Sequence, residues 1–257
     1  YGLEGYFNTV GSTGFSENLL SGEQQTIAPR YPNDSKYSSL AAYYSFKYSI
    51  SPKIIFQMGS RFTYTHLEGE FDTDYYQFPF DGFNMNNSAF NGNLGIVWHP
   101  ATDWQINIHG STGFRSPNID DVAKVFDSEP GTVVVPNPGL KPEYARNMEL
   151  SLIRSYQNKV KVELIGFYTW LKDAMVRRAF DGLGQDSILY DGEMSRVEAL
   201  VNAESATIYG TTLNVDYLFN NQWRTRHDIT ITKGEDSEGF PIRHVPPVFG
   251  SSHFIFE

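Results

Sequence analysis

Long stretches of this chain alternate between apolar and polar residues with a period of two, the pattern of a β-strand with one apolar face. Residues 104–114 are the clearest case, because Trp104, Ile106 and Ile108 alternate with Gln105, Asn107 and His109. Similar patterns predict strands at residues 2–10, 37–48, 54–66, 89–98, 104–114, 144–154, 159–171, 207–219, 223–233 and from 248 to the end. Such strands have about ten residues or more, which suits a tilted membrane crossing.

The connections between the predicted strands alternate in length. Short connections fall at residues 49–53, 99–103, 155–158 and 220–222, and long ones at 11–36, 67–88, 115–143 and 172–206. Outer-membrane barrels have short periplasmic turns and longer extracellular loops. The alternation therefore predicts an antiparallel up-and-down sheet in which consecutive strands pair, with two chemically different ends.

Aromatic residues support a membrane location for this sheet. Tyr48, Trp98, Trp104, Phe219 and Trp223 all flank short connections. Amphipathic rings at one rim are typical of an interfacial girdle. The alternative is a soluble β-sandwich in which the same rings close the end of a core. The two interpretations place Ile106 and Ile108 differently: facing lipid in a barrel, and packed on a second sheet in a sandwich.

The long connection 115–143 contains signals for a helix and a turn. Ser116 followed by Pro117 predicts a helix start, and the apolar spacing that follows predicts a helix over 117–126, covered by residues 133–135. Asp120 and Asp121 fall in its first turns, where the helix dipole favours anions. Further on, 137–140 places Pro at the second position and Gly at the third, which predicts a type II turn.

Two segments of this region resemble the paired sequence boxes of TonB-dependent outer-membrane receptors. The first is Gly113-Phe114-Arg115-Ser116-Pro117-Asn118, and the second is Asn137-Pro138-Gly139-Leu140-Lys141-Pro142-Glu143. Residues 202–210 and 245–250 also resemble strand openings of that family. The resemblance implies an all-β, antiparallel, up-and-down transmembrane β-barrel in the bacterial outer membrane. Residues 1–257 would be part of a barrel of about 22 strands, a fragment with the plug domain and the C-terminal strands absent.

The same resemblance implies a function and partners. A receptor of this family imports a scarce nutrient, such as a ferric siderophore, haem or cobalamin, with energy supplied through TonB. The expected partners are outer-membrane lipid, the receptor's own plug domain, the TonB complex through the missing N-terminal part, and a small nutrient ligand. The box residues are expected to be mainly structural.

Candidate ligand contacts are Arg115, Tyr75, Tyr76 and His109. Arg115 stands where a strand enters a long loop, and its guanidinium is suited to bidentate binding of an anionic group. The alternative is an internal salt bridge to Glu143 or Glu149. Residues 118–136 contain neither His nor Tyr, which argues against the haem-facing histidine that some receptors of this family carry between the boxes.

Other chemistry finds little support. The formal charge of −10 without a basic stripe argues against nucleic acid as a partner. The absence of cysteine excludes disulfides and thiolate metal sites. The six histidines lack ligand spacing, and Asp72 and Asp74 lack the glycine of a calcium loop. We therefore expect no enzyme activity, no metal site and no cofactor. Two alternatives stay open, a soluble or surface-attached glycan-binding β-sandwich and a passive porin-like barrel.

Overall fold

The computed structural model describes residues 1–75, 78–242 and 245–256, and most of these residues lie in strands. The strands are β1 (Gly2–Val10), β2 (Gly14–Glu17), β3 (Gln24–Ile27), β4 (Ser35–Ser51), β5 (Ile54–Glu70), β6 (Gly82–Trp98), β7 (Trp104–Arg115), β8 (Phe126–Glu129), β9 (Thr132–Val134), β10 (Glu143–Tyr156), β11 (Val160–Ala179), β12 (Ser187–Tyr190), β13 (Glu193–Leu218), β14 (Trp223–Asp236) and β15 (Val248–Phe256). The helix α1 spans Ile119–Val122. No helix in the described ranges has the length and apolar character needed to cross a membrane.

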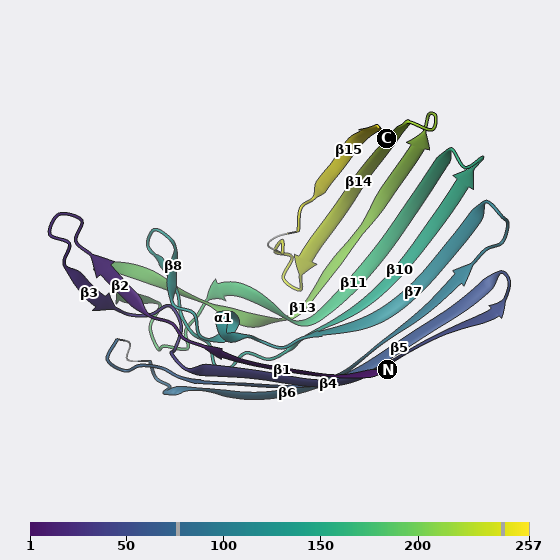
Figure 1. The fold of residues 1–257 in the computed structure, drawn as a ribbon. Coiled ribbons are helices and arrows are strands. Elements are labelled where there is room, and N and C mark those ends of the chain that lie inside the picture. Colours follow the sequence, from purple (N-terminus) through teal and green to yellow (C-terminus); the bar gives the residue numbers. More distant parts are fainter. Residues whose placement is uncertain (76–77, 243–244, 257) are drawn as a thin grey trace.

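The main sheet has the order β1-β4-β5-β6-β7-β10-β11-β13-β14-β15, and its neighbours along this path are antiparallel. The short strands β9 and β12 pair with the loop-side extension of β13, β8 pairs with β9, and β2 pairs with β3. Figure 1 shows a strongly curved, open wall with the short turns gathered at one end and the long connections at the other. The up-and-down prediction is confirmed. The β-sandwich alternative is wrong, because the wall is one continuous sheet.

Several strands extend further into the long connections than the alternation predicts. β5 continues to Glu70, β11 to Ala179, and β13 begins at Glu193 rather than near residue 207. The extensions keep the same antiparallel register, with Ala174 opposite Ala203 and Ala179 opposite Glu198. Beyond the predicted ends, loops cover small side chains such as Ala199 and Ala203. The apolar–polar alternation therefore ends before the hydrogen-bonded ladder does.

The two faces of the wall differ in chemistry as the sequence predicts. On the convex face, Ile108 is 52% exposed and lies opposite Ile96 on β6 and Leu150 on β10, which are exposed as well. On the concave face, the Gln105 amide donates to Asn107 and the Asn107 amide donates to Ser151. A sheet that exposes an apolar row on one side and bonds polar side chains on the other suits lipid outside and a polar lumen inside.

Aromatic residues on the convex face mark the two limits of the apolar band, one near the short turns and one near the long connections. Trp104 lies near the short turns, and Ile108 lies four residues further along β7. The register places Leu150 opposite Ile108 and Gly166 opposite Leu150, and Trp170 lies four residues beyond Gly166 on β11. Eight residues of tilted strand correspond to about 20 Å, close to the apolar band of an outer-membrane barrel. Ile108 therefore lies midway between the two aromatic rows.

Candidate functional site

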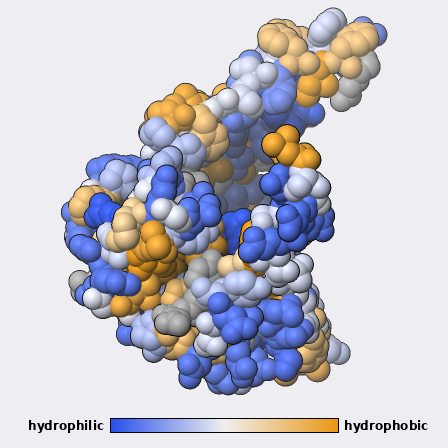
Figure 2. Space-filling view, turned by 90° about the vertical axis from the view of Figure 1, so that its left-hand side faces the viewer, coloured by the Kyte–Doolittle hydropathy of each residue, from blue (hydrophilic) through white to orange (hydrophobic). Residues whose placement is uncertain are grey.

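The connection 116–142 folds onto the concave face at the end of the wall that carries the long loops (Figure 1). Its residues Val122 and Leu140 form a buried cluster with Leu67 of β5 and with Phe83 and Met85 of β6. Figure 2 looks at this end, where hydrophilic side chains dominate the surface and a hollow opens behind the loops. The loop cluster is thus anchored to the inner wall.

The helix α1 is shorter than the sequence predicts. It begins after Asn118, whose side chain caps the backbone N–H of Asp121 while Asp121 accepts from the N–H of Asn118. It ends at Val122 rather than at Phe126, because Phe126 starts strand β8. The predicted cover of the helix by residues 133–135 is wrong, because Val122 packs with Leu67, Phe83 and Met85 of the wall. Val133 and Val135 instead pack with Val125, which lies beyond the end of α1.

Arg115 is held by Asp121. One of its terminal nitrogens lies 2.7 Å and 2.8 Å from the two carboxylate oxygens, and the Asp121 side chain is only 6% exposed. The expected internal salt bridge is present, but its partner is Asp121 rather than Glu143 or Glu149, because the capping geometry of α1 turns Asp121 toward Arg115. Glu143 instead accepts the backbone N–H of Met175 at 2.9 Å. This contact ties the start of the loop to the end of β7.

The second box ties the loop to β13. The Asn137 amide donates to the carbonyl of Leu200, and the Asn202 side chain bonds both the N–H and the carbonyl of Lys141. The type II turn is wrong, since Gly139 lacks the positive φ that such a turn requires. Asn137 reaches the same reversal by accepting from Gly139 N–H with its side chain, while its carbonyl accepts from Leu140 N–H.

The remaining box residues are also engaged in the wall. The Ser116 hydroxyl accepts from Thr65 at 3.0 Å and from Asn87 at 3.1 Å. Pro117 is fully buried, and Phe114 lies 5.5 Å from the ring of Tyr144. Pro138 and Pro142 are half-buried. The mainly structural role expected for the box residues stays a prediction.

The other predicted ligand contacts are not brought together. Tyr75 borders a small crevice with Arg30, Tyr31 and Phe71 in the loops. His109 lies mid-strand on β7, with Glu149 opposite it on β10. Tyr76 lies outside the described residues. Asp72 accepts from the backbone N–H of Asp74, a turn within the loop.

Sequence reasoning missed a group of cations around one aromatic ring. The guanidinium carbons of Arg30 and Arg177 lie 5.0 Å and 5.3 Å from the ring centre of Phe126, and the amine of Lys124 lies 4.5 Å from it. We call these four residues the Phe126 cluster. They come from the connection before β4, the connection between α1 and β8, the start of β8 and the loop end of β11. Only Lys124 and Phe126 are close in sequence, so no local pattern reveals the group.

Asp120 partly neutralises this cluster. Lys124 donates to it at 2.7 Å and the Tyr31 hydroxyl at 2.6 Å. Burial by itself raises the pKa of Asp120, but the hydrogen bonds from Lys124 and Tyr31 and the nearby Arg30 hold that pKa below its ordinary value. Within the described residues Arg30 and Arg177 form no salt bridge. In the described ranges Arg30 and Arg177 are therefore the cations of the cluster that have no salt-bridge partner.

The lowered pKa of Asp120 predicts the pH dependence of this loop. A carboxylate with a lowered folded-state pKa contributes stability above its unfolded-state pKa, and this contribution is lost as the pH falls through the folded-state value. We expect residues 118–126 to lose protection against hydrogen exchange progressively below about pH 4. Asp120→Asn should flatten this dependence. An equally steep loss in that variant would contradict the assignment to Asp120.

No grouping of three or more His, Asp or Glu side chains suited to a metal ion occurs in the part of the chain that the structure describes.

The chain belongs to the TonB-dependent receptors, because residues 1–254 match the family described as "TonB dependent receptor-like, beta-barrel". Membership of this family locates it in the bacterial outer membrane. It is similar to the iron-regulated outer membrane virulence protein of Vibrio cholerae serotype O1, with 33% identity over 36% of this chain and 14% of that protein. It is also similar to the hemoglobin-haptoglobin utilization protein B of Neisseria meningitidis serogroup C, with 26% identity over 67% of this chain and 22% of that protein.

Solved structures share the fold. The copper transporter OprC superposes with a TM-score of 0.77 at 12% identity, over 99% of this chain and 39% of that chain. The Serratia marcescens hemophore receptor HasR, in complex with its hemophore HasA and heme, gives 0.69 at 12% identity over 98% of this chain and 43% of that one. The chain spans less than half of each of these relatives.

Proposed function

We propose that this chain is part of the barrel wall of a receptor that imports an iron-containing nutrient, a ferric siderophore or haem, across the outer membrane. Family membership supports a transport receptor, and relatives named for iron regulation and for hemoglobin-haptoglobin use support iron as the cargo. The wall itself performs no bond chemistry. Ligand capture falls to the long loops, and movement across the membrane is driven through TonB.

The Phe126 cluster carries the ligand part of this proposal. It lies among the long connections and combines a half-buried aromatic ring with the free cations Arg30 and Arg177. Haem propionates and many ferric chelates pair negative charge with flat π-systems. Guanidinium groups bind such anions through charge-assisted hydrogen bonds and stack on aromatic planes.

The proposal includes further parts of the receptor. The sheet is open, with β1 and β15 at its edges, so additional strands are needed to close a barrel. A plug domain would fill the polar lumen, and the TonB complex would act on that plug. These assignments rest on the family and on the greater length of the relatives.

A passive porin-like barrel is the remaining alternative. It predicts transport without energy and without saturable binding. Dissipating the inner-membrane proton gradient therefore separates the two functions, since only the receptor should lose uptake.

The test of the ligand site is Arg30→Gln combined with Arg177→Gln in the full-length protein. We expect affinity for haemin or for a ferric catecholate to fall by about tenfold for each cation removed, because hydrogen bonds to charged groups contribute roughly 1.5–3 kcal/mol. Binding is measured by quenching of tryptophan fluorescence, and uptake by growth with each compound as the sole iron source.

Lys159→Gln is the matched control, since Lys159 is an exposed cation beside the short turn between β10 and β11. It should leave both measurements unchanged. If the double variant binds both probes as the parent does, the Phe126 cluster is not the ligand site.

A further inference from the structure

The hydrogen-bonded ladder between β6 and β7 stops halfway along the two strands. It ends toward the loops where Asn93 lies opposite Ser111. Beyond this pair β6 continues beside β5 and β7 continues beside β10, but in the described part of the chain the two strands no longer pair with each other. Figure 1 shows β6 and β7 separating in this direction. We call the unpaired stretch, residues 88–92 and 112–116, the β6–β7 gap.

Two hydroxyl groups take the place of backbone partners across this gap. The Thr112 hydroxyl accepts from the N–H of Gly92 at 2.9 Å, and the Ser116 hydroxyl accepts from the side-chain amide of Asn87 at 3.1 Å. Between these two contacts the amide oxygen of Asn91 is buried and has no hydrogen-bond partner within the described residues. A buried acceptor without a donor raises the free energy of the arrangement that contains it. The open gap therefore carries a cost at Asn91.

Both sides of the gap have the shape needed to pair. Each side is extended strand, and the register of the paired part continues to Asn91 opposite Gly113. Gly113 has no side chain and Ala89 has only a methyl group, so little bulk separates the strands on the concave face. Because the N–H of Gly92 points toward β7, the N–H of Phe90 does so as well. Closing the gap would give both of these N–H groups backbone partners.

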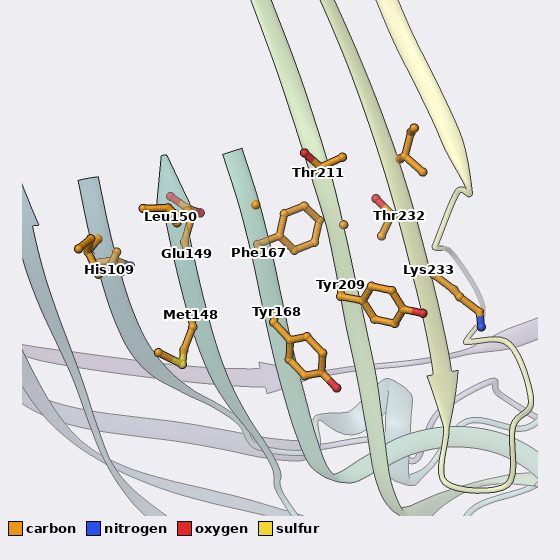
Figure 3. Close-up of a pocket in the computed structure, with 14 residues that line it drawn as sticks. His109, Met148, Glu149, Leu150, Phe167, Tyr168, Tyr209, Thr211, Thr232 and Lys233 are labelled. Carbon is orange, nitrogen blue, oxygen red and sulfur yellow. The ribbon is translucent and has the colours of Figure 1, made fainter. Parts of the chain in front are cut away.

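The sheet is regular on each side of the gap. On one side β5 and β6 stay paired along their whole length. On the other side β7, β10 and β11 keep a continuous register, and Figure 3 shows His109, Glu149 and Phe167 following one another across these strands. A change in the width of the gap therefore moves two intact pieces of wall relative to each other, with the ladder below Asn93 as the hinge.

The two cations of the Phe126 cluster that form no salt bridge in the described ranges come from opposite sides of the gap. Arg30 precedes β4, on the side of β6, and Arg177 belongs to β11, on the side of β7. Their guanidinium carbons lie 5.0 Å and 5.3 Å from the centre of the Phe126 ring. The loop that carries this ring is tied to β7 by the pair of Arg115 and Asp121. An anion held by both guanidinium groups would draw the two sides together.

We propose that the β6–β7 gap is a latch that closes when an anionic ligand bridges Arg30 and Arg177. This inference rests on the ligand site proposed above and adds a conformational response to it. Binding and closure are linked reciprocally, so the ligand binds more tightly to the closed form to the same extent that it favours closure. The latch converts binding among the loops into a change in the wall itself.

The test places cysteines at the gap with Asn91→Cys and Gly113→Cys in the full-length protein, in a background without other cysteines. Residues 1–257 contain none. In a closed ladder this non-hydrogen-bonded pair has its Cα atoms about 4.5 Å apart, within the range of a disulfide. The probe is gallium protoporphyrin, a redox-inert analogue of haemin whose fluorescence reports binding. We expect the bound probe to speed disulfide formation by a mild oxidant about tenfold.

Asn93→Cys with Ser111→Cys is the matched control, because this next pair on the same face already lies in the ladder. Its disulfide should form at the same rate with and without the probe. Adding Arg30→Gln and Arg177→Gln to the gap pair should abolish the acceleration. In the protein without introduced cysteines, hydrogen exchange at the Phe90 amide should slow when the probe binds.

The outcomes separate the latch from the ligand site. Exchange at Phe90 that does not slow while the probe is bound would overturn the latch, whether or not the cysteine variants fold, and would leave the ligand site standing. Disulfide formation at the gap that is equally fast with and without the bound probe would overturn the latch as well. Failure of the probe to bind would overturn the ligand site, and the latch with it.

Discussion

Ile108→Arg is expected to destabilise the full-length protein by about 2–4 kcal/mol, the cost of an arginine on a lipid-facing strand at the bilayer midplane. Ile108 lies halfway between the Trp104 row and the Trp170 row, and its side chain is 52% exposed on the convex face. A guanidinium at this depth must be desolvated or must draw water into the bilayer. The free energy of unfolding in lipid vesicles, from denaturant titration followed by tryptophan fluorescence, measures the cost.

His109→Arg is the matched control, because it adds the same group one residue along the same strand but on the concave face. Glu149 lies opposite it in the register and favours the added charge. We expect a change much smaller than that of Ile108→Arg, and Asn107→Ala should also cost much less. Comparable losses in Ile108→Arg and His109→Arg would mean that the convex face does not contact lipid.

The wall could be predicted from the sequence because a membrane barrel imposes a strict period of two. Every second residue of 104–114 faces lipid, so the alternation of Trp104, Ile106 and Ile108 carries the orientation of the whole strand. The prediction stops short on β13, where Val197 and Ala199 are covered by loops rather than by lipid. In that part of β13 an apolar side chain no longer indicates a position that faces lipid.

The loop end could be predicted only where the signals are local. The two boxes predict where the loop is anchored. They do not predict that Asn137 forms an Asx turn or that Asp121 is the partner of Arg115. The Asp121 carboxylate can both cap α1 and bind Arg115 only because β7 ends, and α1 begins, at particular residues. The Phe126 cluster joins residues from segments separated by up to about half the chain, so only the folded loops reveal it.

The Asp121 carboxylate has two structural roles. It accepts both hydrogen bonds from Arg115 and completes the capping box with Asn118 at the start of α1. The loop then continues from α1 to Lys124 and Phe126, so the position of the cationic cluster depends on this tie.

Asp121→Ala is accordingly expected to loosen the loop without unfolding the wall. Losing charge-assisted bonds at a buried carboxylate should lower the local opening free energy by roughly 2 kcal/mol, which speeds hydrogen exchange about 30-fold. Exchange is measured at the backbone amides of Val122 and Ala123, which bond to Asn118 and Ile119. Asp127→Ala is the control, because Asp127 is exposed in the same loop and its side chain has no hydrogen bond within the described residues. Unchanged exchange in Asp121→Ala would show that the buried cluster around Val122, rather than the Arg115–Asp121 pair, holds the loop on the wall.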